Sequence, residues 1–456
     1  MQRMNHLKQL LIMSLYRSNL VIIGAGPGGY ETAALAARQG HKVTLIERGE
    51  LGGTCLNRGC IPTKALCASA SKVLDLKDAA AFGVEVTHWR ADFAAAAARM
   101  RQVVSGLRDG VAQELSGVDI VHGCARLAST GPSVWVGEDQ YVADRLIIAT
   151  GSVPAALPIP GAELAMTSDD LLALYTLPGS IAIIGGGVIG MEFASILNAF
   201  GVEVTVLEFC KEILPPFDRD VAKRLRSLLS RRGIKIIVGA SATSIEREAE
   251  SGLRVDYEAK GKPQSLAVDA ALMAVGRKAS LPQGTEDAGI KVDDKGFIMV
   301  DDGYRTSREH IYAIGDVNGR CMLAHAASAQ GRCVLGEDVD MNVVPSALFT
   351  TPEAAMVGLT EEQCQGRGLH YKVSRALYAS NGKAVAMGDA QGFVKLISHC
   401  DDGAILGCHI LGAHAADLIS EVATAMASSL TVRDIAAAIH THPSLSETVW
   451  KAASSC

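Results

Sequence analysis

Two stretches of the chain share one pattern of apolar and polar positions. In the first, the apolar residues 21–23 meet a glycine-rich turn, an alanine-rich segment follows to about Gln39, and a second apolar run ends at Glu47. The same order recurs between Ile181 and Glu208. Short apolar runs beside glycine are typical of buried parallel strands, and the segment between them is typical of a helix. The pattern predicts two strand–turn–helix–strand units.

The two units match residue by residue. Each glycine of the second unit, and its closing glutamate, lies 161 residues after its counterpart in the first. The matched pairs are Gly24 and Gly185, Gly26 and Gly187, Gly29 and Gly190, Gly40 and Gly201, and Glu47 and Glu208. In a dinucleotide-binding unit the first glycine permits a tight turn, the second admits the pyrophosphate, the third brings helix close to strand, and the acid binds a ribose. One copy could be an ordinary glycine-rich turn, but two complete copies predict two bound dinucleotides.

Composition narrows the class of protein. The chain has 456 residues, of which 48% are apolar and 20% charged, and its net charge is −6. These values are typical of a globular protein of two to four domains. Nucleic acid is not expected as a partner because no long basic run exists, and no membrane span is expected because no run of about 20 apolar residues exists. Eleven widely spread cysteines favour reduced thiols and a cytoplasmic location over a disulfide framework.

Residues 1–17 precede the first predicted strand and are slightly basic, without any acidic residue. Their apolar run from Leu10 to Leu15 is short, and no small-residue cleavage site follows it. We therefore expect a disordered extension, or a true start of the protein at Met13, rather than a cleaved targeting peptide.

One close pair of cysteines, Cys55 and Cys60, follows the first unit. In a regular helix, residues five apart have Cα atoms about 8.6 Å apart, whereas a disulfide tolerates no more than about 7 Å. A disulfide here requires an irregular turn, which Asn57 and Gly59 would permit, and Pro62 suits the first turn of the helix that follows. A zinc half-site and two unrelated core cysteines remain alternatives, although no second close pair supplies further zinc ligands.

A second candidate group lies near the C-terminus, where His440 and His442 are followed by Pro443 and Glu447. Proline is common at the first position of a helix, so His442 is predicted immediately before a helix, with Glu447 in its first turns and able to orient the imidazole. An imidazole base would assist thiol–disulfide exchange, because an ordinary thiol is mostly protonated near neutral pH. A surface histidine at a helix start, and a metal site built on the H-x-H spacing, remain alternatives on these residues alone.

Together these motifs resemble the pyridine-nucleotide disulfide oxidoreductase family over about residues 18–453. The stretches that carry the resemblance are GGTCLNRGCIPTK, GGGVIGMEF, IYAIGDV with MLAH, TTPEAAMVGLTEEQ and HTHPSLSET. The resemblance implies an α/β fold with two Rossmann-like dinucleotide-binding domains plus a C-terminal α+β dimerisation domain. Arg58 replaces the small apolar residue usual at its position and Thr63 a common serine, but neither change removes a chemical role.

The resemblance also implies the cofactors, FAD in the first unit and NAD in the second. The cofactor-binding residues that it implies are Gly24, Gly26, Gly29, Glu47, Gly53, Thr54, Thr150, Gly151, Asp316, His325, Gly185, Gly187, Gly190, Glu208 and Gly276. Within this set Glu47 would bind the adenosine ribose of FAD and Asp316 its ribityl chain. Glu208 would bind the ribose of NAD, and its charge would repel the 2′-phosphate of NADP.

Chemical roles follow from the same resemblance. The catalytic residues that it implies are Cys55, Cys60, Lys64, Glu192, His442 and Glu447, with no metal ion. Cys55 and Cys60 would form the redox disulfide, with Cys55 as the interchange thiol and Cys60 against the flavin. Lys64 and Glu192 resemble an ion pair beside the reactive edge of the flavin.

His442, oriented by Glu447, resembles the acid–base of the family and would come from the other subunit of a homodimer. His440 matches a family position to which we assign no role. The implied activity is oxidation of dihydrolipoyl groups with NAD as the acceptor. The implied partners are lipoyl carrier domains of 2-oxo acid dehydrogenase complexes or the glycine cleavage carrier. A family reductase of glutathione-like or mercuric substrates, and a non-catalytic flavin redox sensor, are the alternatives.

The domain layout completes these expectations. The predicted segments are an N-terminal extension over 1–17, FAD-binding segments over 18–150 and 277–344, an NAD-binding domain over 151–276 and a dimerisation domain over 345–456.

Overall fold

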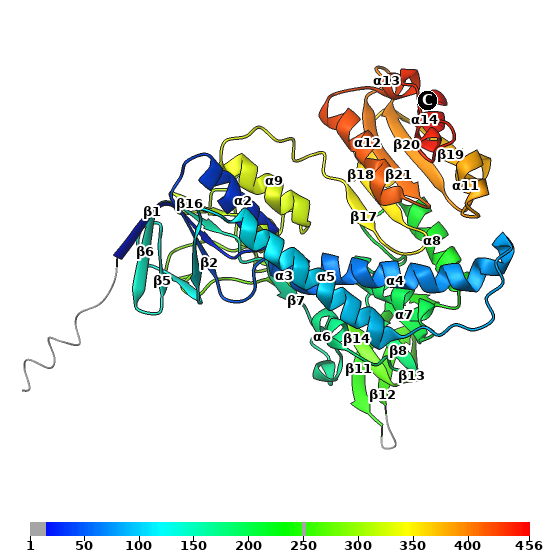
Figure 1. Ribbon diagram of the computed structural model, residues 1–456, viewed down its shortest axis with the longest axis horizontal. Helices are drawn as coiled ribbons and strands as arrows, with labels where there is room; N and C mark the ends of the chain where they lie inside the picture. The colour runs from blue at the N-terminus through cyan, green and yellow to red at the C-terminus, as the bar shows by residue number, and fades with distance from the viewer. Residues whose placement is uncertain (1–14, 249–251) are drawn as a thin grey trace, which may run out of the picture. The chain divides into compact units, whose positions relative to one another are not determined.

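The computed structural model describes residues 15–248 and 252–456, which form two compact units (Figure 1). The first unit comprises the chain up to Pro62, Met100–Ala155 and Arg277–Met341, and the second comprises Thr63–Arg99, Ala156–Gly276 and Asn342–Cys456. The changes of unit near 155, 276 and 341 lie close to the predicted domain boundaries at 150, 276 and 344. Two points differ from the predicted layout. Residues 63–99 group with the second unit, and the NAD-binding and dimerisation segments group together.

A seven-stranded sheet forms the centre of the first unit. Its strands are β1 Leu15–Ile23, β2 Val43–Glu47, β3 Asp119–His122, β4 Ala125–Leu127, β5 Ser133–Val136, β6 Asp139–Ile148 and β16 Ile311–Ala313. The order is β3-β2-β1-β6-β5-β4, with β16 also paired to β6. Strands β1, β2, β3, β6 and β16 pair in parallel, while β4 and β5 are antiparallel. Residues 15–17, which the sequence assigned to the extension, belong to β1, and residues 1–14 lie outside the described residues.

Helices α2 Pro27–Arg38, α3 Gly53–Arg58 and α9 Ala324–Val334 complete the first unit, with the short pair β7 Ser152–Pro154 and β15 Arg277–Ala279. The inner residues of β1 and β2 and one side of α2 share an apolar core that includes Leu20, Ile22, Ala33 and Leu45. The predicted strand at 21–23, the predicted helix to about Gln39 and the predicted strand that ends at Glu47 are thereby confirmed.

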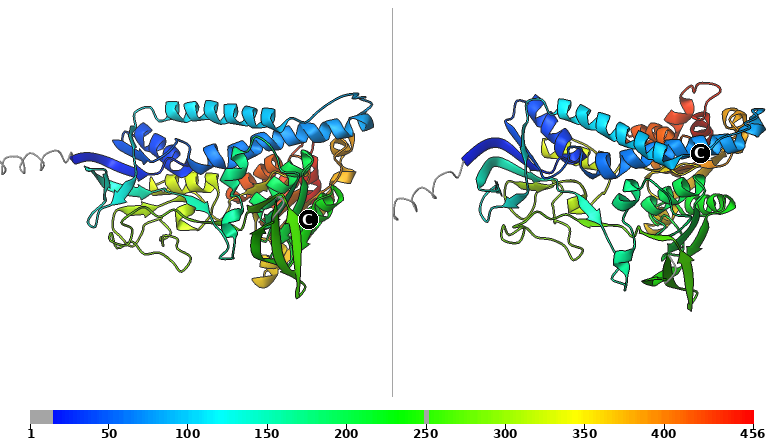
Figure 2. Two further views of the ribbon diagram at one scale, coloured as in Figure 1. Left: turned by 90° about the horizontal axis from the view of Figure 1, so that it is seen from below. Right: turned by 60° about the horizontal axis from the view of Figure 1, so that its bottom comes forward.

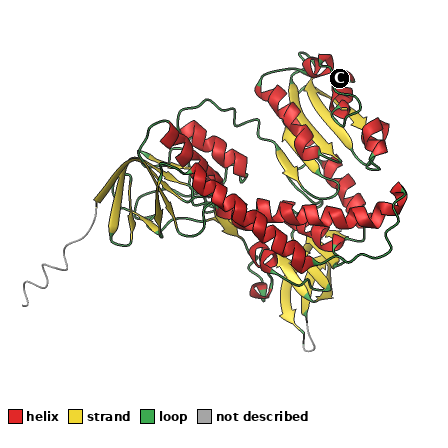
Figure 3. Cartoon of the chain, viewed as in Figure 1, coloured by secondary structure: helices red, strands yellow, loops and turns green. Residues whose placement is uncertain are grey.

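Three sheets build the second unit, and helices alternate with strands through its nucleotide-binding segment (Figure 3). The parallel sheet has the order β10-β9-β8-β14, from Lys235–Val238, Glu203–Glu208, Ser180–Ile184 and Ala270–Met273. An antiparallel sheet of β11 Ala240–Arg247, β12 Leu253–Ala259 and β13 Lys262–Val268 follows it in the chain. Helices of this segment are α6 Ser168–Ala173, α7 Val188–Ala199 and α8 Arg219–Arg231. The second predicted strand–turn–helix–strand unit is therefore confirmed as β8, α7 and β9.

The C-terminal sheet of the second unit is antiparallel, with the order β17-β18-β21-β20-β19. Its strands are β17 Ser346–Leu348, β18 Ala354–Gly358, β19 Tyr371–Leu377, β20 Phe393–His399 and β21 Ile405–Leu411. The helices are α10 Glu361–Gly366, α11 Gly382–Ala386, α12 Ala415–Ala427, α13 Val432–Ala437 and α14 Glu447–Ser454. An apolar core between the strands and α12 and α14 includes Tyr378, Leu396, Val422 and Val449.

Two long helices, α4 Cys60–Asp78 and α5 Phe93–Glu114, explain why residues 63–99 group with the second unit (Figure 2). The change of unit falls within each helix, after Pro62 in α4 and after Arg99 in α5, so each helix contributes residues to both units along one continuous backbone. Within the second unit, the Nζ of Lys77 on α4 donates to the carbonyl oxygen of Ala199 at the end of α7, at 2.9 Å. Arg99 on α5 donates to the carbonyl oxygen of Ala65 on α4 at 3.4 Å. No helix in the described ranges has the length and apolar character that a membrane crossing requires.

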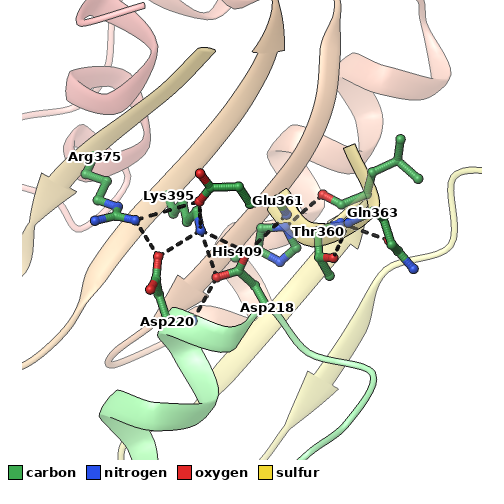
Figure 4. A network of polar contacts seen from close by, with 9 residues as sticks. Asp218, Asp220, Thr360, Glu361, Gln363, Arg375, Lys395 and His409 are labelled. Carbon is green, nitrogen blue, oxygen red and sulfur yellow. Dashed lines mark hydrogen bonds and ion pairs between the residues drawn. The ribbon is translucent and has the colours of Figure 1, made fainter. Parts of the chain in front are cut away.

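A buried lysine ties the C-terminal sheet to the nucleotide-binding segment of the second unit (Figure 4). The Nζ of Lys395, on β20, lies 2.9 Å from Asp218, 2.8 Å from Asp220 and 2.6 Å from Glu361. Lys395 is 1% exposed and Asp218 is fully buried. Burial alone would lower the pKa of Lys395, but hydrogen bonds to the three carboxylates outweigh it and raise the pKa above its ordinary value. The lysine is therefore held in its charged form.

His409, on the neighbouring strand β21, lies directly opposite Lys395. Its Nε2 donates to the carbonyl oxygen of Leu359 at 2.9 Å, and burial lowers its pKa, so the imidazole stays neutral beside the ammonium. The positive charge of Lys395 is thus compensated by the carboxylates, and the neutral histidine adds no charge to the group.

We expect Lys395→Met to lower the free energy of unfolding by about 3–5 kcal/mol, because it leaves Asp218 as an uncompensated buried carboxylate. Lys372→Met, on the neighbouring strand β19 but exposed, is the matched control and should change stability by no more than about 0.5 kcal/mol. Urea unfolding of the purified full chain measures both. Equal unfolding midpoints for the two variants would contradict the role given to the buried cluster.

Candidate functional site

The first glycine-rich turn is closed by backbone contacts that leave no room for side chains. A Cβ on Gly29 would lie 1.8 Å from the carbonyl oxygen of Gly24, whose own φ of +101° is in the left-handed region. Gly53, at the start of α3, packs its backbone on the same turn, since a Cβ there would lie 2.5 Å from the Cα of Gly26. The turn, the N-terminus of α2 and the start of α3 therefore form a bare backbone cradle whose N–H groups suit a phosphate.

The second glycine-rich turn repeats this geometry between β8 and α7. A Cβ on Gly190 would lie 2.0 Å from the carbonyl oxygen of Gly185. By contrast, a Cβ on Gly187 would have nothing within 4 Å. Gly190 is therefore required by the fold itself, whereas the space above Gly187 matters only if a ligand enters it.

The two closing acids adopt the same arrangement. Glu47 accepts hydrogen bonds from the N–H groups of Ala25 and Gly49, both at 2.7 Å. Glu208 accepts from the N–H groups of Gly186 at 2.5 Å and Cys210 at 2.6 Å. Each carboxylate oxygen retains a lone pair, so both acids can still accept from a ribose hydroxyl.

Asp316 lies at the start of a short 3₁₀ turn in the first unit, where Ser152 and Arg277 fix it. The hydroxyl of Ser152 donates to Asp316 at 2.5 Å and accepts from the Nε of Arg277 at 2.7 Å. Neither Ser152 nor Arg277 was predicted, because their contacts join segments more than 120 residues apart.

Among the remaining residues implied to bind cofactors, Thr150 fits a ligand best. Its hydroxyl is buried and has no hydrogen-bond partner among the described residues. A buried polar group is seldom left unsatisfied, so a polar group of the cofactor would complete it. Gly151 and Gly276 have φ of +68° and +116° at the two crossings between units, and His325 is exposed at the start of α9. The residues present therefore fit FAD in the first unit and NAD in the second.

The cysteine pair spans an interruption between two helices. Cys55 lies in α3 and is half-buried, whereas Cys60 is exposed and begins α4. Gly59 separates the helices with φ −143° and ψ −110°, and a Cβ there would lie 3.0 Å from the carbonyl oxygen of Thr54. The predicted irregular turn is confirmed, as is Pro62 in the first turn of α4. Cys55 lies beside the backbone cradle, because Gly53 in the same helix touches Gly26, and Cys60 follows it directly across the break.

Asn57 holds this turn in place through contacts that the sequence did not predict. Its Nδ2 donates to the carbonyl oxygens of Leu51 and Gly53, both at 2.9 Å. Its Oδ1 accepts from the Nε and Nη2 of Arg108, on α5, at 3.1 and 2.8 Å. Arg108 also pairs with Glu50 at 3.1 Å. Every polar atom of the Asn57 side chain is thus used to hold α3, the helix that carries Cys55.

The predicted ion pair is present in the second unit. The Nζ of Lys64 lies 2.9 Å from one oxygen of Glu192 and 3.0 Å from the other. Phe349 fixes both, since its N–H donates to Glu192 at 3.0 Å and its ring lies 4.5 Å from the ammonium. Cys67, one turn after Lys64, is not suited to thiolate chemistry, because burial and the neighbouring Glu192 raise its pKa to about 12.

His442 and Glu447 are also brought together, but the helix begins later than predicted. The Nδ1 of His442 lies 2.9 Å from Glu447, and the imidazole is 79% exposed. Because a carboxylate only accepts, Nδ1 carries the proton and Nε2 is left able to take one. The hydrogen bond from the N–H of Ser444, followed by that from His442, holds the pKa of Glu447 below its ordinary value.

The prediction that α14 starts directly after His442 was wrong, since the helix begins at Glu447. The side chain of Asn381 donates to the carbonyl oxygen of Ser444 at 2.9 Å, and Glu447 accepts from the N–H of the same residue at 2.9 Å. Ser444 therefore uses both backbone groups outside a helix. The sequence could not show this, because Asn381 lies 63 residues earlier.

Comparison with known proteins places these features in a family. Residues 18–331 match the family described as pyridine nucleotide-disulphide oxidoreductase, and residues 344–453 match its dimerisation domain. The chain belongs to the pyridine nucleotide-disulphide oxidoreductase family. It is therefore an oxidoreductase with FAD and NAD(H) as cofactors, and its C-terminal sheet with α12–α14 is the dimerisation domain of this family.

Curated relatives share most of their length with this member of the family. A dihydrolipoyl dehydrogenase from Chlamydia muridarum is 41% identical over 445 residues, which cover 94% of each chain. The dihydrolipoyl dehydrogenase from Geobacillus stearothermophilus is 38% identical over 446 residues, 95% of each chain. Among solved structures, the HOCl-induced flavoprotein disulfide reductase RclA from Escherichia coli is 33% identical, with a TM-score of 0.85 over 96% of this chain and 99% of that one.

The two glycines of the second turn allow the fold and the ligand site to be tested separately. We expect Gly187→Ala to weaken NADH binding at least tenfold while the free energy of unfolding changes by no more than about 0.5 kcal/mol, since the Cβ meets no protein atom. Gly190→Ala should weaken binding and also destabilise the fold. NADH titration and thermal unfolding measure the two effects, with Gly106→Ala, in an open position on α5, as control. Unchanged NADH affinity in Gly187→Ala would exclude a pyrophosphate at this turn.

Proposed function

We propose that this chain acts as a dihydrolipoyl dehydrogenase, which oxidises dihydrolipoyl groups on a carrier protein and passes the electrons through FAD to NAD+. The observation that carries the proposal is the placement of Cys55 and Cys60 across the Gly59 break, next to the backbone cradle of the first turn. A dithiol beside a flavin site and a separate pyridine-nucleotide site are the two parts that this reaction requires. The names of the relatives from Chlamydia muridarum and Geobacillus stearothermophilus support the same substrate.

In the proposed reaction the protein residues handle protons and sulfur. The Nε2 of His442, from the second subunit of a homodimer, takes a proton from one substrate thiol. The resulting thiolate attacks Cys55 of the Cys55–Cys60 disulfide, so that a mixed disulfide with Cys55 forms while the Cys55–Cys60 bond breaks and Cys60 leaves as a thiolate. The second substrate thiol then displaces Cys55, which releases the cyclic disulfide and leaves both cysteines reduced. When bound, FAD accepts this electron pair and supplies it as hydride to NAD+.

The other residues of the site would hold these groups in position. Asn57, fixed by Arg108, keeps the cysteine turn against the cradle. Lys64, with both Glu192 oxygens as partners and one aromatic face beside it, supplies a positive charge of fixed position. We assign this charge to the reactive edge of the flavin.

A reductase of another disulfide is the second candidate, because the flavoprotein disulfide reductase RclA shares the fold over nearly the whole chain. The two candidates differ in direction and substrate. A dihydrolipoyl dehydrogenase reduces NAD+ with a dithiol, whereas the alternative consumes NADH or NADPH to reduce its own disulfide substrate.

We expect purified protein to form NADH from dihydrolipoamide and NAD+, and to show far lower activity with NADPH and glutathione disulfide. Cys55→Ser and Cys60→Ser should abolish this turnover, because no disulfide can accept electrons, and His442→Gln should lower kcat by about 10²–10⁴-fold. Cys400→Ser, an exposed cysteine on the turn after β20, is the matched control and should keep full activity. Full dihydrolipoamide turnover by Cys55→Ser would reject the proposed function.

Coenzyme choice gives an independent test. Glu208 is held by two backbone N–H groups and is 6% exposed, so it cannot turn away from a 2′-phosphate. We expect kcat/KM for NADH to exceed that for NADPH by at least about 100-fold, which corresponds to about 2.7 kcal/mol of discrimination. Steady-state kinetics with both coenzymes measures the ratio, and equal values would show that Glu208 does not contact the ribose.

A further inference from the structure

The side chain of His440 anchors the upstream side of the segment that carries His442. Residues 437–443 are exposed throughout, with Ile439 fully so, except for His440, whose side chain is only 9% exposed. On the downstream side, the segment is held by buried Leu445 and by the hydrogen bonds of Ser444. His442 therefore lies between two attachment points, and His440 is the first of them.

Both ring nitrogens of His440 are hydrogen-bonded to acceptors. Its Nδ1 lies 3.1 Å from the carbonyl oxygen of Ala438, within the same segment. Its Nε2 lies 2.8 Å from Oε1 of Glu421, in the middle of α12. Both partners accept hydrogen bonds, so the ring links its own backbone to a neighbouring helix through its two nitrogens.

The geometry points to His440 and Glu421 as positioning residues for His442. This inference rests on the proposed function, in which His442 is the acid–base. The ion pair clamps the backbone at residues 438–440 to α12, and it thereby fixes the point from which the Thr441–His442 backbone projects the imidazole. A charge-assisted hydrogen bond such as that between His440 and Glu421 is stronger than one between neutral groups, and the low exposure of His440 protects it from solvent. Because both ring nitrogens of His440 are engaged by these two contacts, it acts on the reaction only through His442.

The same helix offers a matched control. His414 and Asp417 form a second histidine–carboxylate pair at the start of α12. Both side chains are more than half exposed, and the distance from Nδ1 of His414 to the carboxylate of Asp417 is 3.4 Å. His414 has φ of +57°, which asparagine tolerates, so His414→Asn and Asp417→Asn remove this pair without strain. The control pair has the same chemistry as His440 and Glu421 but does not hold the segment of His442.

The test compares His440→Gln and Glu421→Gln with these controls in the full-length holoenzyme. We expect kcat/KM for dihydrolipoamide to fall about tenfold to a hundredfold in both variants, the loss that a small misplacement of a catalytic group produces. NADH-dependent reduction of an artificial electron acceptor does not need the base, so it should stay at the level of the unsubstituted protein. The control variants should keep both activities.

A double-mutant cycle separates positioning from a general structural effect. In the His442→Gln background, His440→Gln should cause no further loss of dihydrolipoamide turnover, because it acts through a group that is already absent. Independent and multiplicative losses would overturn the inference, as would equal activity of His440→Gln and the unsubstituted enzyme. A fall in both activities together would assign the pair a structural role and also overturn it.

Amide hydrogen exchange tests the clamp without reference to the substrate. Exchange within residues 437–446 should accelerate about tenfold or more in His440→Gln and Glu421→Gln, and remain unchanged in the two controls. If the unsubstituted protein fails to oxidise dihydrolipoamide, the proposed function fails, while accelerated exchange still supports the clamp. Unchanged exchange rejects the clamp whatever the substrate proves to be.

Discussion

Both nucleotide cradles depend on one close approach between backbone atoms. At the start of each crossover helix, Gly29 or Gly190 lies so near the carbonyl oxygen of the first glycine that a methyl group would not fit. This approach directs the N–H groups of the first helical turn at the space above the glycines. Glu47 and Glu208 fix the same turns through backbone N–H groups. A cradle held in this way before a ligand arrives loses little conformational freedom when a phosphate or ribose binds, which favours tight binding without a large apolar pocket.

The features that the sequence predicted are those set by neighbours along the chain. Strand, glycine turn, helix and closing acid follow one another within about thirty residues of a βαβ unit, so apolar runs and glycine spacing suffice to predict β1, α2 and β2 and their repeat. The break between the two cysteines is equally local, because Gly59 permits it. The late start of α14 is different, since a side chain 63 residues away takes the carbonyl of Ser444. The grouping of residues 63–99 with the second unit likewise depends on side chains of α4 that contact α7.

No local sequence pattern predicted the buried lysine of the C-terminal sheet. A lysine within an apolar strand normally marks the solvent face, yet Lys395 is almost completely buried. Its partner Asp218 precedes α8, and the sequence pattern of neither segment predicts that the two residues form an ion pair. Alternation along β20 places Val394 and Leu396 in the core beneath α14, and Lys395 on the opposite face. One strand thus supports the helix of Glu447 on one side and the ion pair to the nucleotide-binding segment on the other, so a loss at Lys395 would disturb the platform of the proposed base.

The two histidines of the H-x-H motif show how hydrogen-bond counting assigns roles that spacing could not. Both ring nitrogens of His440 contact acceptors and its side chain is nearly buried, so it offers no ring nitrogen to a substrate. His442 donates from one ring nitrogen, and its exposed imidazole keeps the other able to accept. A metal bound by both histidines would need a free ring nitrogen on each, whereas both ring nitrogens of His440 already have partners. The motif therefore combines one histidine whose two ring nitrogens are both engaged and one whose Nε2 remains able to accept a proton, and the second is the one suited to proton transfer.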